Sequence, residues 1–160
     1  MTGLSLSTNE CVNTMDQDIQ NMLRRYRERD IDLSQLRVRL DGEGTRVEAQ
    51  IPQDQLLKLK RGSEAQSNGA IARLLPACIH YLSVGEPKQF ISRLEYQQYS
   101  QRRDTIVDSG VLSEIISPPF SSEAPGSAGA TMYYRCMQCR SIWAFVEPEI
   151  ADNGSWIRII

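Results

Sequence analysis

The sequence predicts an α+β domain, and three observations support that prediction. Apolar residues recur at helical spacing near the N-terminus, and apolar and polar residues alternate in several short runs further along. A stretch rich in Pro, Ser, Gly and Ala separates these from a C-terminal cysteine pair. We expect a flexible N-terminus at residues 1–13, an α+β body at 14–116, a Pro/Ser/Gly loop at 117–130, and a small antiparallel β unit at 131–160 packed on the body.

An amphipathic helix is expected over residues 15–29. Ile19, Leu23 and Tyr26 recur at helical spacing, and Asp16 places a negative charge at the start, where it suits the helix dipole. The end of this helix carries a cluster of arginines, namely Arg24, Arg25, Arg27 and Arg29. Such a cluster is typical of a solvated last turn, and the other interpretation is a binding patch.

The sequence of the next segment predicts a β-hairpin. Apolar and polar residues alternate at 36–40 and again at 46–51, and the Asp-Gly-Glu-Gly run at 41–44 is a turn signal between them. A short helix is expected at 54–60 and a loop at 61–69.

Residues 70–83 allow two interpretations. Their apolar residues fit one helical face, but Pro76 would interrupt a helix by removing a backbone donor. The other interpretation is a helix that ends before Pro76, followed by a strand at 77–83. Only an extended backbone there would put Cys78 and His80 on one face.

A further helix is expected over 87–103, with Phe90, Ile91 and Leu94 facing inward. The sequence does not decide which secondary structure the apolar segment at 111–116 forms. Beyond the loop at 117–130, three short strands are expected at 131–136, 141–147 and 155–160.

Composition limits the classes of function. The chain has 160 residues, and its 18 basic and 20 acidic residues give a net charge of −2, which argues against nucleic acid as a partner. No apolar run approaches the roughly 20 residues of a membrane span, and the N-terminus lacks the features of a signal peptide. A cytoplasmic protein is expected. Its four cysteines then indicate metal binding or packing before disulfides.

Cys136 and Cys139 are spaced as in the turns of ribbon-type zinc sites. A closed structural zinc site needs two more ligands, and Cys78 with His80, the only histidine, would complete a Cys3His shell. The alternatives are a tight turn without any cofactor, and a thiol-redox pair.

No motif for an enzyme is present: the chain has no glycine-rich phosphate loop, no His-Glu-x-x-His pair and no G-x-S-x-G elbow. Glu147, Glu149 and Asp152 follow an aromatic-rich run, where they could act as acid and base or form a solvated rim. Together with Trp143 they have the composition of an interface for a basic protein partner, since aromatic anchors provide burial and carboxylates steer association. The alternative for Trp143 is a place in the core.

The C-terminal residues also resemble a known pattern. Tyr134-Arg135-Cys136-x-x-Cys139-x-x-x-Trp143, then Glu147-Pro148, Gly154 and Trp156-Ile157-Arg158-Ile159, is similar to the ending of small bacterial immunity proteins encoded beside polymorphic or contact-dependent toxins. A glycine commonly follows the second cysteine in that pattern, and Arg140 stands there in this chain. The resemblance implies a cytoplasmic, non-catalytic protein that binds a cognate toxin domain and blocks it.

The alternative function is a zinc-ribbon-like module that contacts nucleic acid or a transcription complex. It would combine the cysteine pair with the arginines of the first helix, and it predicts steeply salt-dependent binding of nucleic acid.

Overall fold

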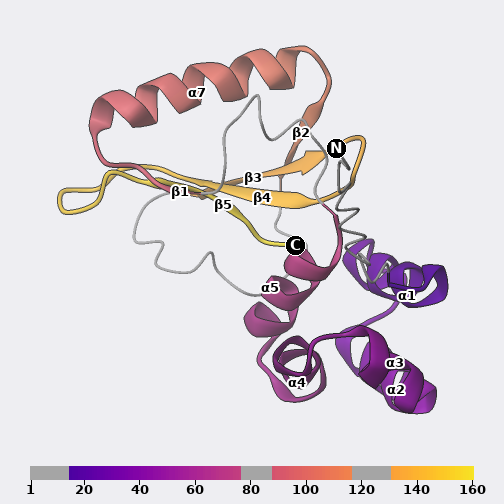
Figure 1. Ribbon diagram of the computed structural model, residues 1–160. Coiled ribbons are helices and arrows are strands. Elements are labelled where there is room, and N and C mark those ends of the chain that lie inside the picture. Colours follow the sequence, from indigo (N-terminus) through magenta and orange to yellow (C-terminus); the bar gives the residue numbers. More distant parts are fainter. Residues whose placement is uncertain (1–14, 77–87, 117–130) are drawn as a thin grey trace, which may run out of the picture.

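A computed structural model describes residues 15–76, 88–116 and 131–160 of the chain. Its helices and its five-stranded antiparallel sheet confirm the α+β class. Figure 1 shows α7 lying along one side of the sheet, while the helices α1 to α5 gather on the other side, beyond one end of the strands. The expectations for residues 1–13 and 117–130, and for a strand at 77–83, lie outside the described residues.

The N-terminal part is a group of short helices. They are α1 (Gln17–Arg27), α2 (Leu33–Glu43), α3 (Thr45–Gln50), α4 (Gln53–Arg61) and α5 (Glu64–Leu74). Ile19, Leu23 and Tyr26 of α1 are fully buried in their shared core. The Tyr26 hydroxyl donates a hydrogen bond to Asn68 Oδ1 at 2.9 Å, which joins α1 to α5. Burial, aided by the nearby Glu64, raises the pKa of Tyr26 to about 12.

The expectation of a β-hairpin at residues 36–51 is wrong, because this segment forms α2 and α3. Leu36 and Leu40 are both buried, as residues four apart on one helical face should be, while Val38 between them is 72% exposed. The start of α2 is fixed by Asp32, whose side chain accepts a hydrogen bond from Gln35 N in a reciprocal capping box.

The loop expected at 61–69 is also wrong. Ser63 and Gln66 form a second capping box that begins α5 at Glu64. The short helix expected at 54–60 is α4, one residue longer at each end. The helix α5 ends at Leu74, before Pro76, as one of the two interpretations of 70–83 requires.

The helix expected at 87–103 begins later and extends further. Residues 88 and 89 form the short strand β1 (Lys88–Gln89), and Ser92 caps α7 (Arg93–Asp108). This shift leaves Phe90 buried but exposes Ile91 and Leu94, which were expected to face inward.

The sheet has the order β1-β5-β4-β3-β2, with every neighbouring pair antiparallel. Its other strands are β2 (Leu112–Ile115), β3 (Thr131–Cys136), β4 (Ile142–Val146) and β5 (Ser155–Arg158). The three C-terminal strands lie where the sequence predicts them. The edge strands β1 and β2 come from the segment before residue 117, so the C-terminal strands are the middle of a larger sheet.

The central strand β4 is buried at all five positions. Trp143 and Phe145 join the aromatic core beneath α7, which also holds Phe90, Tyr99, Tyr134 and Trp156. Ile142, Ala144 and Val146 belong to the core formed with the N-terminal helices. Alternate residues of β4 therefore contribute to two different cores.

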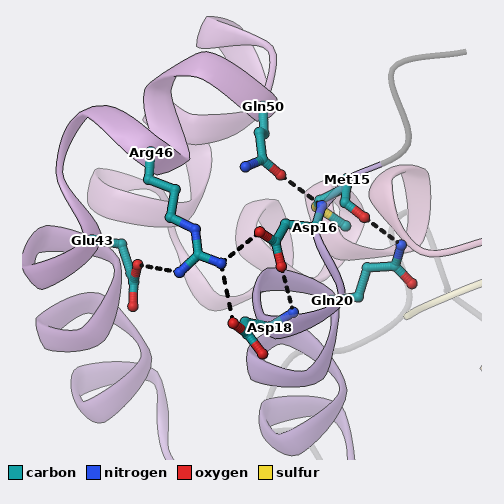
Figure 2. A network of polar contacts seen from close by, with 7 residues as sticks. All are labelled: Met15, Asp16, Asp18, Gln20, Glu43, Arg46 and Gln50. Carbon is teal, nitrogen blue, oxygen red and sulfur yellow. Dashed lines mark hydrogen bonds and ion pairs between the residues drawn. The ribbon is translucent and has the colours of Figure 1, made fainter.

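A network of charged groups ties α1 to α2 and α3, as Figure 2 shows. The Arg46 guanidinium contacts the carboxylates of Asp16 at 2.5 Å, Asp18 at 3.1 Å and Glu43 at 3.2 Å. The hydrogen bond from Arg46 is the main cause that lowers the pKa of Asp16. The Asp16 backbone N–H also donates to Gln50 Oε1, at the end of α3.

Within the described ranges, no helix has the length and apolarity needed to cross a membrane.

Candidate functional site

The acidic residues lie in the turn between β4 and β5. Glu149 N donates to Asp152 O at 2.8 Å, which closes the turn, and Asp152 Oδ1 accepts from Gly154 N at 2.7 Å. Thus Asp152 shapes the turn, and its carboxylate is half-buried. We call residues 147–152 the acidic turn.

Gly154 allows the chain to enter β5 from this turn. Its φ is +81°, a conformation that glycine adopts without strain. A Cβ atom built on Gly154 would lie 2.3 Å from the carbonyl oxygen of Val146, so the backbone here approaches β4 too closely for a side chain.

The two glutamates of the acidic turn differ in their surroundings. Glu149 is exposed, and Glu147 is half-buried at the end of β4. Burial raises the pKa of Tyr96 on α7, and the charge of Glu147 raises it further, which places this carboxylate near α7. Among the described residues, neither glutamate has an ion-pair partner.

The start of α7 is joined to the acidic turn. Arg93 Nη2 donates to the backbone oxygen of Glu149 at 2.6 Å, and Phe90 N donates to Gly154 O at 3.0 Å. Figure 1 shows the first turn of α7 and the β4–β5 turn at the same end of the sheet.

Three large apolar side chains are exposed in these joined segments. Ile91 is 85% exposed, Leu94 is 64% exposed and Ile150 is fully exposed. Exposed apolar groups beside charged ones are typical of a surface that binds another protein. Sequence reasoning missed Ile91 and Leu94 because it placed them inside a helix that in fact begins at Arg93. The Ser92-x-x-Glu95 capping signal could have located that start.

Trp143 does not belong to the exposed rim. Its ring is 1% exposed and stacks on Trp156, with the ring centroids 4.9 Å apart and an interplanar angle of 14°. Its Nε1–H donates to Ser141 Oγ at 2.9 Å. Trp143 therefore stabilises the strands that carry the acidic turn, and the core interpretation of this residue is the correct one.

The cysteine pair lies at the opposite end of β4. Cys136 ends β3, and residues 137–140 form the turn to β4, closed by the hydrogen bonds Cys136 N to Ser141 O and Arg140 N to Cys136 O, both at 2.9 Å. Cys136 is fully buried in the aromatic core, and Cys139 packs against that core. Cys139 Sγ lies 3.0 Å from Ser141 Oγ, within hydrogen-bond distance.

Arg140 takes the left-handed conformation, with φ of +66°. This is the position where the immunity-protein pattern commonly has glycine, which adopts such a φ freely. At this position the backbone of Arg140 adopts a left-handed conformation that is unfavourable for a residue with a Cβ atom.

Positively charged side chains lie beside Cys139. In the described part of the chain, no three His, Cys, Asp or Glu side chains gather to hold a metal ion, and Cys78 and His80 lie outside that part. Instead, Arg24, Arg27 and Arg140 line a cavity beside Cys139. Guanidinium groups repel a cation. The zinc site with Cys78 and His80 stays a prediction, because those two residues lie outside the described part.

The four arginines of the first helix do not form one exposed patch. Arg27 is 3% exposed, and Arg24 donates to Gln20 Oε1 at 3.1 Å. Only Arg25 and Arg29 are exposed, and Arg29 pairs with Glu64 at 3.7 Å.

Comparison of the chain with models of protein families, with curated proteins and with solved structures finds no match.

Proposed function

We propose that this chain is a non-catalytic immunity protein, acting in the cytoplasm, that binds and neutralises a cognate bacterial toxin domain. The observation that carries the proposal is the combination at one end of the sheet of exposed Ile91, Leu94 and Ile150 with the carboxylates of Glu147 and Glu149. The resemblance of the C-terminal residues to immunity proteins supports the same function.

This surface suits a partner with a basic face. The apolar side chains would contribute burial at the centre of the contact, and the carboxylates would steer a positively charged domain toward it. The glutamates are available for this because no described residue forms an ion pair with either of them.

The experiment begins with a tagged form of the chain, used to capture the toxin from the source cells at low and moderate salt. The captured protein is then tested for growth arrest when expressed alone and when co-expressed with the chain. One dominant protein that arrests growth alone, and no longer does so with the chain, would support the proposal. Nucleic acid that washes off as salt rises, with no stoichiometric protein, would overturn it and favour the nucleic-acid module.

The position of the interface is tested with charge reversal. Glu147→Lys with Glu149→Lys should slow association with the toxin about tenfold or more at low salt, because steering becomes repulsion. The matched control is Glu48→Lys with Glu114→Lys, which makes the same change of charge at exposed positions on α3 and β2. Equal association rates for the two double variants would refute the placement of the interface at the acidic turn.

A further inference from the structure

A cavity of about 440 Å³ lies between α1 and the turn that holds the cysteine pair. Its walls include the side chains of Arg24, Arg27 and Arg140. Leu75, Pro76, Gln138 and Cys139 also line it. This turn is at the opposite end of β4 from the acidic turn, so the cavity is separate from the proposed toxin interface.

Arg27 is the unusual residue of this cavity. It is 3% exposed, and its Nε has no hydrogen-bond partner among the described residues. Its nearest carboxylate oxygen, Glu28 Oε1, is 3.9 Å away, too far for a hydrogen bond. A buried guanidinium nitrogen without a hydrogen-bond partner is costly, because it has lost its contact with water and gained no hydrogen bond in its place.

The charges around the cavity are not balanced. Arg140 pairs with Glu28 Oε2 at 3.3 Å, and Arg27 faces the other oxygen of the same carboxylate. Arg24 donates to the neutral side chains of Gln20 and Asn21. Three guanidinium groups therefore share one described carboxylate, which leaves an excess of positive charge at the cavity.

The electrostatics of Arg27 agree with this count. Burial is the largest influence on Arg27 and lowers its pKa, while Glu28 and Cys139 act in the opposite direction. Arg158 and Arg24 then lower the pKa of Arg27 further by repulsion. An anion in the cavity would relieve both the burial cost and this repulsion.

We propose that the cavity binds a small oxyanion of the phosphate class, held by Arg27, Arg24 and Arg140. The planar guanidinium group matches the oxygens of phosphate with paired hydrogen bonds, and a phosphate anion would offset the excess of positive charge. Gln138 adds a neutral polar group at the same wall. The cavity has room for more than one phosphate group, so the ligand is either the free ion or the phosphoryl group of a larger molecule.

Equilibrium dialysis with radiolabelled inorganic phosphate tests the proposal, at an ionic strength kept constant with chloride. The whole chain should bind one phosphate saturably. Arg27→Met, which keeps an apolar stem in place, should weaken binding at least about tenfold. Arg140→Gln should weaken it as well, whereas Arg39→Gln, at an exposed position on α2, should leave it unchanged.

Two results would overturn the proposal: no saturable binding by the unaltered chain at phosphate concentrations up to about 10 mM, or equal binding by all the variants. Circular dichroism checks that Arg27→Met is folded. If it is not, Arg140→Gln decides, because that side chain is 37% exposed and outside the core. Adenosine monophosphate as competitor separates the two sources of the anion: tighter binding than phosphate identifies a phosphoryl monoester, and weaker binding than phosphate identifies the free ion.

Discussion

Replacing Gly154 by alanine should destabilise the protein strongly, because two separate costs coincide there. The left-handed conformation costs a residue that has a Cβ atom about 1–2 kcal/mol. The new methyl group would also lie 2.3 Å from the Val146 carbonyl oxygen, a backbone atom of β4 that can move only if its pairing with β5 is disturbed. We expect a total loss of about 3 kcal/mol in the free energy of unfolding.

Two other glycines serve as controls for the same substitution. Gly110 has a φ of +79° with no atom within 4 Å of the added Cβ, so its replacement by alanine should cost only the conformational part, about 1–2 kcal/mol. Gly42 lies in α2 with open space around it, and alanine there should stabilise the protein by up to about 1 kcal/mol.

Urea denaturation followed by tryptophan fluorescence is the suitable assay, because Trp143 and Trp156 are the only tryptophans and both are buried in the sheet. The slope of the transition should be the same for all variants, so that the midpoints report stability. If Gly154→Ala cost no more than Gly110→Ala, the close approach to Val146 would be refuted, and with it the shape of the acidic turn.

The free energy of unfolding at acidic pH should depend on the ionisation of Asp16. The pKa of its carboxyl is lower in the folded protein than in the unfolded chain, so the stability it provides is present above the unfolded pKa and is lost as pH falls through the folded pKa. Arg46→Gln should flatten the decline of the urea midpoint between about pH 5 and pH 3, and an unchanged decline would contradict the network. Separately, Ser141→Ala should cost about 1–3 kcal/mol, because Trp143 Nε1 would lose its buried acceptor. A loss below about 0.5 kcal/mol in thermal unfolding would show that this bond is unimportant.

The fold could be predicted from the sequence where the signals were local and unambiguous. The helix α1 has the apolar spacing of one helical face, and the three C-terminal strands are short apolar or aromatic runs bounded by turn residues. Residues 36–40 fit both a strand and a helix, because apolar residues at alternate positions include a pair four apart. The packing of Leu36 and Leu40 against the other helices decides between them. The capping boxes at Asp32 and Ser63 were the local signals that could have corrected the prediction.

The candidate site was harder to predict than the fold. Sequence reasoning placed Glu147 and Glu149 at the surface because charged residues are rarely buried. It could not place Trp143, since burial of that ring depends on α7 covering one face of the sheet. It also could not foresee the cavity at Arg27, because that site joins the end of α1 to residues more than a hundred positions later.

The order of the strands has a consequence for how the protein is made. Of the described strands, β1 and β2 occur first in the sequence, yet they occupy the two outer edges of the sheet. During translation, both edges leave the ribosome before β3, β4 and β5, which must enter between them, have been synthesised. The N-terminal helices, whose contacts are closer in sequence, can pack earlier. We therefore expect a nascent chain in which folded helices precede an open pair of strand edges, and such edges need shielding from other chains until the last strands arrive.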